Sequence, residues 1–405
     1  MTLADRSLVA PELVDDPYGY FRELRENDPV HWSEHHRAWL LTRYDDVRAA
    51  FRDPRLSAER VSSMLPRGAL STEEPGTDAI RRLLGNWMVF RDPPAHGRLR
   101  RLARAAFTTR RIEQLRTAVR EVATGLIDAV ADEAEFDLVR DFAFPLPATV
   151  IARLLGVPEA DQDRFRRWSE DLEPIVFGGL DPGARRERAV PSLFALEAYF
   201  NGLLERRRRE PGDDLLTALA AAEEAGDALS NDEVVATCIL LLFAGHETTT
   251  NLIASGFLAL HGDSAAWQRL RDDAAIAPSA VEELLRYDGP SKIQPRVALE
   301  GHDLRGREIG AGDRVFLVQA AANRDPERFP DPDRLRLDRP DNEHLAFGHG
   351  IHHCLGAPLA RLEAEVAFST LSEYLPYLEV VGGGPRWRAS VLGRGLVSLP
   401  VRSRS

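Results

Sequence analysis

Apolar positions along the chain recur mainly with the spacing of an α-helix. Between residues 110 and 132 they lie three and four positions apart, which places them on one face of a helix. Further helices are predicted at residues 16–27, 44–51, 145–155, 193–209, 278–287 and 357–374. Strand-like segments are few and short, with a hairpin at residues 30–43 and strands at 315–318 and 396–401. The pattern indicates a mainly α-helical protein.

The longest predicted helix begins near Ser230 and runs to about Leu260. Ser230 and Glu233 have the spacing of a capping box, in which each side chain accepts the backbone N–H of the other residue. The apolar run that follows is typical of a buried helix. Its middle, residues 244–250, carries a glutamate and three threonines. Burying such groups is costly unless they are paired or used, so this break in the pattern predicts a functional site.

The organisation of the chain favours one continuous domain over residues 1–405. No segment repeats with a period of roughly 20 to 50 residues, and no low-complexity linker divides the sequence. Residues 55–89 are interrupted by Pro, Gly and Ser, and we expect a long loop there, of the kind that often carries function.

Charge and hydropathy narrow the classes of partner. The formal net charge of −12 argues against nucleic acid, because phosphate binding needs clustered positive charge. The longest strongly apolar stretch, residues 236–245, is too short to span a bilayer, and the first residues contain no apolar signal-peptide core. We therefore expect a cytoplasmic protein without a membrane anchor. Lys292 is the only lysine, and we expect it at the surface.

The two cysteines, Cys238 and Cys354, are too few for a disulfide framework. Cys238 lies in the apolar part of the long helix and is expected to be a core residue. Cys354 lies in the glycine-rich segment 347–356, just before the predicted helix at 357–374. Backbone N–H groups at a helix N-terminus stabilise a thiolate, so Cys354 is predicted to be a nucleophile or a metal ligand.

Four segments, in the expected order and spanning most of the chain, resemble motifs of the cytochrome P450 family. Residues 244–248 resemble its oxygen-activating motif, residues 283–286 its Glu-x-x-Arg helix motif, and residues 92–100 the helix that clamps the haem propionates in bacterial members. The match to the haem-binding signature of that family comprises Phe347, Gly348, Gly350, His352, Cys354 and Gly356. The resemblance implies a single, mainly α-helical domain of triangular-prism shape with small β-sheets.

The resemblance also implies haem b (iron protoporphyrin IX), with Cys354 as the ligand of its iron. Gly348, Gly350 and Gly356 would let the backbone approach the porphyrin and the sulfur. Phe347 would pack near the macrocycle and shield the thiolate.

Cationic side chains are expected to hold the haem propionates. We expect Asp92 to cap a helix whose first residue is Pro93. His96 and Arg100 are four positions apart on that helix, so both can reach one anion. By resemblance, the propionate-binding set comprises His96, Arg100, Arg296 and His352.

Glu247 and Thr248 are the expected catalytic residues. Cleavage of dioxygen needs protons, which Glu247 would relay from solvent as a general acid while the Thr248 hydroxyl holds a water molecule. The alternative is that the hydroxyls of this segment merely bond back to carbonyl groups of their own helix. Gly245 is expected to leave room above the iron.

Glu283 and Arg286 lie three positions apart on a predicted helix. An ordinary surface pair at this spacing contributes only a few tenths of a kcal/mol. The resemblance implies instead a buried structural network that also contains Arg328.

The implied reaction inserts one oxygen atom from O2 into a hydrophobic small molecule, by hydroxylation or epoxidation, in secondary metabolism. No flavin-binding or iron–sulfur segment is present, so a ferredoxin and a ferredoxin reductase are expected as electron donors, with arginines 98, 101 and 104 contributing to docking. A peroxide-driven peroxygenase of the same fold and a non-catalytic haem-binding partner protein are alternatives. A cysteine-nucleophile hydrolase would need a dedicated base, for which only the histidines at 352 and 353 are near Cys354.

The substrate is expected to contact a mostly apolar surface, which favours a medium-sized polyketide, terpenoid, steroid or fatty acid. The residues expected to line this surface are Val89, Leu241, Ala244, Ile293 and Val391.

Overall fold

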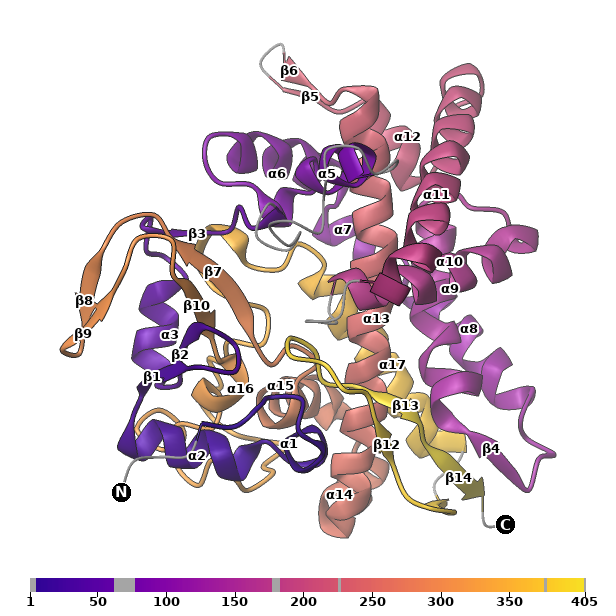
Figure 1. Cartoon of the computed structure of the whole chain (residues 1–405). Helices are drawn as coiled ribbons and strands as arrows, with labels where there is room; N and C mark the ends of the chain where they lie inside the picture. Colours follow the sequence, from indigo (N-terminus) through magenta and orange to yellow (C-terminus); the bar gives the residue numbers. More distant parts are fainter. Residues whose placement is uncertain (1–4, 62–76, 177–182, 225–226, 375–376, 404–405) are drawn as a thin grey trace. The chain divides into compact units, whose positions relative to one another are not determined.

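The structure, a computed structural model, describes residues 5–61, 77–176, 183–224, 227–374 and 377–403 (Figure 1). The described chain is mainly helical with small β-sheets, which confirms the predicted fold class. It divides into two compact units, each assembled from separate stretches. Met1–Leu56, Ile112–Pro147 and His246–Ser405 form the first, and Ser57–Arg111 and Ala148–Gly245 form the second. The expectation of one continuous domain stays a prediction.

The first unit contains helices from both ends of the chain and a mixed β-sheet. Its helices are α1 (Pro11–Asp15), α2 (Tyr18–Asn27), α3 (Tyr44–Ala50), α8 (Arg116–Asp128), α14 (Ser264–Asp272), α15 (Ala277–Asp288), α16 (Gln319–Ala322) and α17 (Ala357–Tyr374). Its strands are β1 (Val30–Ser33), β2 (Ala38–Leu41), β4 (Glu135–Asp137), β7 (Gln294–Ala298), β8 (His302–Leu304), β9 (Arg307–Ile309), β10 (Arg314–Leu317), β11 (Leu378–Val380), β12 (Arg386–Trp387), β13 (Leu396–Ser398) and β14 (Pro400–Ser403).

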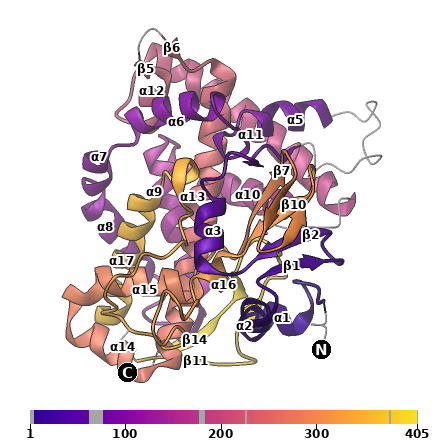
Figure 2. The ribbon, with the colours of Figure 1, turned by 90° about the vertical axis from the view of Figure 1, so that its left-hand side faces the viewer.

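The main sheet has the order β1-β2-β10-β7-β3, with β10 parallel to β2 and antiparallel to β7 (Figure 2). Alternate residues of a strand face opposite sides of a sheet. Val315 and Leu317 of β10 accordingly join one core cluster, which includes Val47 of α3. Phe316 joins a second cluster, which includes Phe21 of α2. Both faces of this sheet are therefore buried, and pairing with β10 holds β7 within it.

The second unit is almost entirely helical. Its elements are α5 (Thr77–Gly85), α6 (Ala95–Ala106), α10 (Gln162–Val176), α11 (Gly183–Arg209), α12 (Leu215–Ala220), β5 (Glu223–Glu224) and β6 (Asp227–Ala228). Phe165 of α10 packs edge-on against Tyr199 and Phe200 of α11, with ring centroids 4.7 and 5.6 Å apart. Four elements lie across a boundary between the units: β3 (Leu56–Ser57), α7 (Thr109–Glu113), α9 (Pro145–Leu154) and α13 (Asn231–Gly262).

The predicted long helix is confirmed as α13 (Asn231–Gly262). Its capping box is present, because the Glu233 N–H donates to Ser230 Oγ at 3.3 Å and the Ser230 N–H donates to Glu233 Oε2 at 2.8 Å. A Cβ added at Gly245 would lie 3.1 Å from Ile151 Cγ1 of α9, so glycine there permits close helix packing. In the described residues, no helix is both long enough and apolar enough to cross a membrane.

Four predicted elements differ in detail. The helix expected at residues 193–209 begins earlier, because α11 spans Gly183–Arg209. The helix expected at residues 110–132 is two helices, α7 and α8, and the strand expected at 396–401 is two strands, β13 and β14, that belong to different sheets. The loop expected at 55–89 contains helix α5, while residues 62–76 lie outside the described part of the chain. In α5 the apolar residues Ile80, Leu83 and Leu84 do have helical spacing, which the flanking Pro and Gly residues obscured.

Candidate active site

The segment from Phe347 to Gly356 folds back on itself before α17 begins at Ala357. The Cys354 N–H donates to the Phe347 carbonyl at 2.9 Å, and Gly350–His352 form a single 3-10 turn within the loop. Cys354 is exposed and forms no disulfide. The loop therefore presents one accessible sulfur just before the N-terminus of a long helix.

Two glycines of this loop are required by its backbone. Gly348 and Gly350 have φ angles of 71° and 72°, in the left-handed region that other residues rarely adopt. A Cβ at Gly350 would also lie 3.1 Å from both the Phe51 carbonyl oxygen and Arg52 Cγ. At Gly356 an added Cβ would make only an ordinary contact, 3.9 Å from the Cys354 sulfur. The backbone conformation therefore requires glycine at Gly348 and Gly350, two of the three glycines that were predicted to let the loop approach the porphyrin.

The segment from Phe347 to Gly356 is called the cysteine loop below. Phe51, at the end of α3, contacts both this loop and Arg296. Its ring lies 3.5 Å from the position of a Cβ at Gly348, and the Arg296 guanidinium carbon lies 5.7 Å from its centroid. Arg296 is a buried residue of β7, and its Nη1 donates to the Pro295 carbonyl at 2.9 Å. Nothing in the sequence distinguishes Phe51 from other core aromatic residues.

The residues of the first unit fit a haem. The described residues contain no cluster of three or more His, Cys, Asp or Glu side chains that could hold a bare ion. A single exposed thiol instead suits the iron of a haem, for which the porphyrin would supply the other ligands. Buried Arg296 and half-buried His352 are side chains of the kind that pairs with the porphyrin's carboxylates.

His96 and Arg100 belong to the second unit and lie one turn apart on α6, as their spacing predicts. His96 is buried and Arg100 is half-buried. The expected start of this helix was wrong. The helix begins at Ala95, and the Asp92 carboxylate does not cap it, because it accepts the Ser57 hydroxyl and, at 3.0 Å, the Ala58 N–H.

In the middle of α13, Glu247 is 7% exposed and has two side-chain partners. Arg388 Nη1 donates to Glu247 Oε1 at 2.5 Å, and Asn251 Nδ2 donates to the same oxygen at 3.4 Å. Thr248 is half-buried. Sequence reasoning missed Arg388, which lies 141 positions from Glu247 and carries no motif.

Glu363 of α17 is a second carboxyl near this helix, and it is fully buried. Burial raises its pKa well above the usual range, and the Thr249 hydroxyl beside it offsets only part of that rise. Burial at this position therefore favours the protonated, uncharged form of the Glu363 carboxyl. Sequence reasoning missed it because it occupies one position of a regular helical pattern.

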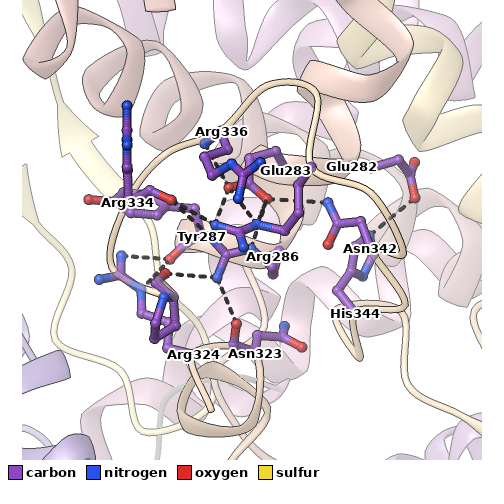
Figure 3. A network of polar contacts seen from close by, with 12 residues as sticks. Glu282, Glu283, Arg286, Tyr287, Asn323, Arg324, Arg334, Arg336, Asn342 and His344 are labelled. Atoms are coloured by element: carbon purple, nitrogen blue, oxygen red, sulfur yellow. Dashed lines mark hydrogen bonds and ion pairs between the residues drawn. The ribbon is translucent and has the colours of Figure 1, made fainter. Parts of the chain in front are cut away.

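Glu283 and Arg286 of α15 form the buried network that the resemblance implied (Figure 3). Both side chains are 0% exposed, and Arg286 Nε donates to Glu283 Oε2 at 2.8 Å. Arg286 also donates to the carbonyl groups of Asn323 and Pro332, at 2.9 and 2.8 Å. The helix thereby holds the irregular segment that leads to the cysteine loop.

The second arginine of this network is Arg339, and the prediction of Arg328 was wrong. Arg339 Nε lies 3.1 and 3.0 Å from the two Glu283 carboxylate oxygens, and its side chain is 2% exposed. Arg328 instead donates to the Asp341 carbonyl at 3.0 Å and pairs with Glu343. Arg339 follows Arg328 in the chain, in the irregular segment that the network holds against α15.

The residues expected to line a substrate site fall into two groups. Val89 is 40% exposed, and Leu241 and Ala244 are half-buried residues of α13. Ile293 and Val391 are only 1% and 4% exposed and belong to the second core cluster, which leaves them little surface for a ligand.

Two further expectations concern residues outside the loop. Cys238 is a buried core residue, as predicted, and burial raises the pKa of its thiol. Lys292 is 3% exposed, so the expectation of a surface lysine was wrong. Its Nζ donates to the Ser390 carbonyl at 2.7 Å.

Comparison with known proteins places these features in a family. Residues 195–374 match the Cytochrome P450 family model. The chain is 42% identical to the cytochrome P450 monooxygenase PikC of Streptomyces venezuelae, over 99% of this chain and 94% of that protein. It is also 42% identical to the mycinamicin IV hydroxylase/epoxidase of Micromonospora griseorubida, over 95% of this chain and 94% of the relative.

A solved structure agrees with these relatives. The myxobacterial cytochrome P450 CYP267B1, in complex with myristic acid, is 40% identical, has a TM-score of 0.89, and covers 98% of this chain and 99% of its own. Likeness over nearly the whole length, together with an exposed cysteine in the segment that resembles the haem-binding signature, leads to one assignment. The chain belongs to the cytochrome P450 family, as a monooxygenase whose cofactor is haem b.

Proposed function

We propose that this enzyme hydroxylates or epoxidises a medium-sized hydrophobic natural product of secondary metabolism. The names of the relatives support this class of substrate, since one acts on mycinamicin IV and one solved neighbour holds myristic acid. The accessible apolar surface of Val89, Leu241 and Ala244 is compatible with such a molecule. The proposed substrate is therefore a polyketide, terpenoid, steroid or fatty acid.

The observation that carries the proposal is the single accessible thiol of Cys354 in a loop with two left-handed glycines. In this role Cys354 is the iron ligand, and bound haem supplies the activation of O2. Gly348 and Gly350 keep the loop flat enough to lie against a porphyrin, and Phe347 covers the side of the thiolate.

The expected propionate-binding residues of the first unit are buried Arg296 and half-buried His352. His96 and Arg100, the expected residues of the second unit, lie one turn apart on α6, so both can reach one anion. Charge-assisted hydrogen bonds to carboxylates are about twice as strong as neutral ones, so each of these pairs would hold a carboxylate firmly.

Glu247 and Thr248 would deliver protons. The Glu247 carboxylate is buried but paired with Arg388, whose side chain is 32% exposed and thus reaches toward solvent. A proton passed to Glu247 can move on to a water molecule held by the Thr248 hydroxyl. The pair is intact in this chain, which favours a monooxygenase over a peroxide-driven peroxygenase.

The electrons would come from a ferredoxin and its reductase, which meet the enzyme in the cytoplasm. Of the arginines expected to contribute to docking, Arg98 is already used, because it pairs with Glu233 at 2.6 Å and with Asp227 at 2.9 Å. Arg104 of the same helix is exposed. Docking would therefore depend more on Arg104 than on Arg98.

An optical titration of the purified protein tests the proposal. A low-spin Soret band that shifts toward high spin with particular hydrophobic natural products would support it and would name the substrate class. We expect Cys354→Ala to abolish the thiolate spectrum and Cys238→Ala, at the buried cysteine, to keep it. A protein that stays colourless after haem is supplied, or a normal thiolate spectrum from Cys354→Ala, would contradict it.

A further inference from the structure

Phe347, the first residue of the cysteine loop, is covered by a cation. The guanidinium carbon of Arg361 lies 4.6 Å from the centroid of the Phe347 ring, within the range of a cation–π contact. Arg361 belongs to the second turn of α17, the helix that begins directly after the loop. The Phe347 backbone carbonyl in turn accepts the Cys354 N–H. A positive charge is thus fixed to the residue that closes the loop around the sulfur.

Glu282 holds Arg361 in this orientation. Its Oε1 accepts from Arg361 Nε at 2.6 Å and its Oε2 from Arg361 Nη2 at 3.0 Å, a two-point pair that fixes the plane of the guanidinium. Burial alone would raise the pKa of Glu282, but hydrogen bonds from His344 and Arg361 lower it to about 2. The carboxylate therefore stays ionised across the physiological range.

His344 gives the Glu282 carboxylate a further hydrogen-bond partner. Its Nδ1 accepts the Ala346 N–H at 3.2 Å, so the ring proton lies on Nε2, which is 3.2 Å from Glu282 Oε2. The His344 ring also lies 6.0 Å from the Phe347 ring. The Arg361 cation thus lies against Phe347, and the Glu282 carboxylate lies at the edge of its guanidinium.

This cluster is separate from the Glu283 network although the two glutamates are adjacent. Figure 3 shows Glu282 directed toward His344, away from Arg286 and its partners. Glu283 braces the segment before the loop, whereas Glu282 acts on the loop through Arg361. The structural network therefore does not account for Glu282, Arg361 and His344.

We propose that Arg361 is a positioning residue that holds Phe347 against the haem–thiolate site and raises the reduction potential of the bound haem, with Glu282 moderating that effect. The inference rests on the proposed ligation of haem by Cys354. One-electron reduction adds negative charge to the site, and a fixed cation stabilises the reduced form. Removing the cation should lower the potential, and removing the anion should raise it.

Redox titration of the haem-loaded protein against dithionite tests this inference. We expect Arg361→Gln to shift the redox equilibrium toward the ferric form by threefold to tenfold, where tenfold corresponds to about 59 mV for one electron. Glu282→Gln should shift it in the opposite direction. Arg361→Lys keeps the charge and should restore most of the potential lost in Arg361→Gln. Arg120→Gln is the matched control, since Arg120 pairs with Glu373, at the opposite end of helix α17 from Arg361.

Opposite signs for the two glutamine variants, with an unchanged Arg120→Gln, would support the inference. Shifts in the same direction, or none above twofold in either variant, would overturn it, because a merely structural role moves both potentials alike. If Arg361→Gln fails to retain haem, the Glu282→Gln variant alone tests the inference. A higher reduction potential than that of the wild type would support it, and a lower or unchanged potential would overturn it. Failure of the proposed function would look different, since the wild-type protein would then give no haem–thiolate spectrum to titrate.

Discussion

The Arg388 guanidinium donates to the Glu247 carboxylate at 2.5 Å and so ties the middle of α13 to the C-terminal hairpin of β12 and β13. The hairpin is fixed at this point by the Arg388 N–H, which donates to the Gly395 carbonyl at 2.9 Å. Gly395 in turn leaves room for Asn251, whose Oδ1 would lie only 2.0 Å from a Cβ at that position. The expected proton relay thus depends on a segment far away in the sequence.

Arg388→Gln should impair turnover without abolishing haem binding. The substitution leaves a 7%-exposed carboxylate without its cation, and it frees the carboxylate to leave its position. A positioned acid or base contributes at least about 10²-fold to rate, and we expect a loss of roughly tenfold in product formation from this indirect change. Arg388→Lys should recover part of it. Product formation at the wild-type rate in Arg388→Gln would show that Glu247 works without this partner.

Thr248→Ala should separate reductant consumption from product formation. Without the hydroxyl that holds a water molecule, protons arrive in the wrong place, and hydrogen peroxide should be released instead of oxidised product. Thr250→Ala is the matched control, because Thr250 Oγ1 is buried and has no hydrogen-bond partner among the described residues. The measurement is the ratio of peroxide to product per reductant consumed. Fully coupled turnover in Thr248→Ala would refute the assigned role.

Arg339→Ala should destabilise the protein by about 1.5–3 kcal/mol, the usual contribution of hydrogen bonds to a buried charge, because Glu283 loses one of its two arginine partners and keeps Arg286. Its side chain is 2% exposed and contacts Glu283, which is 0% exposed. Arg328→Ala is the matched control, because the Arg328 side chain is 28% exposed and pairs with an exposed glutamate; it should cost at most about 1 kcal/mol. Chemical unfolding and haem content measure both effects.

Glu283→Ala removes the shared partner of both buried arginines and should yield no haem-loaded protein. Equal losses of stability in Arg328→Ala and Arg339→Ala, or normal haem content in Glu283→Ala, would contradict the network as described.

Features with a local cause could be predicted from the sequence. The bounds of α17 match the predicted helix at residues 357–374, and the capping box at Ser230 gave the start of α13 to within one residue. The positive φ angles of Gly348 and Gly350 follow from a glycine-rich loop that must fold back on itself. In each case neighbouring residues in the sequence are also the residues that interact.

The errors concern contacts that depend on irregular segments. Five arginines lie between residues 324 and 339, and no periodicity indicates which of them reaches Glu283. The strand pattern at residues 396–401 likewise does not reveal that β13 pairs with β12 while β14 pairs with β11. Contacts such as Arg388 with Glu247 and Phe51 with Arg296 need the tertiary fold itself.

Lys292 shows how distant pairing can override a composition rule. Lysines are almost never fully buried, which favoured a surface position. The backbone of Lys292 donates to the Leu392 carbonyl at 2.8 Å, and Ser291 forms a bridge with Gly393. This pairing between two segments about 100 residues apart encloses the amine. Burial, and to a smaller extent the charge of Arg394, lowers the pKa of Lys292 to about 7.

The buried amine predicts a specific dependence of stability on pH. Between pH 7 and about 10.4, its unfolded-state pKa, Lys292 is protonated in the unfolded chain but neutral in the folded one, so stability rises with pH across this window. Lys292→Met lacks this titration. The variant should therefore exceed the wild type in stability most at pH 7 and below, with the difference shrinking toward pH 10 by about 1.4 kcal/mol for each pKa unit of the shift.

Chemical unfolding of both proteins from pH 6 to pH 10 measures this difference, in which other titrating groups cancel. Lys292→Arg is the matched control, because its charge persists over the whole range and its stability relative to Lys292→Met should not change with pH. A constant difference between wild type and Lys292→Met would mean that the folded protein keeps Lys292 protonated. The amine would then have access to water or to a counter-charge, and the enclosed position next to the Ser390 carbonyl would be wrong.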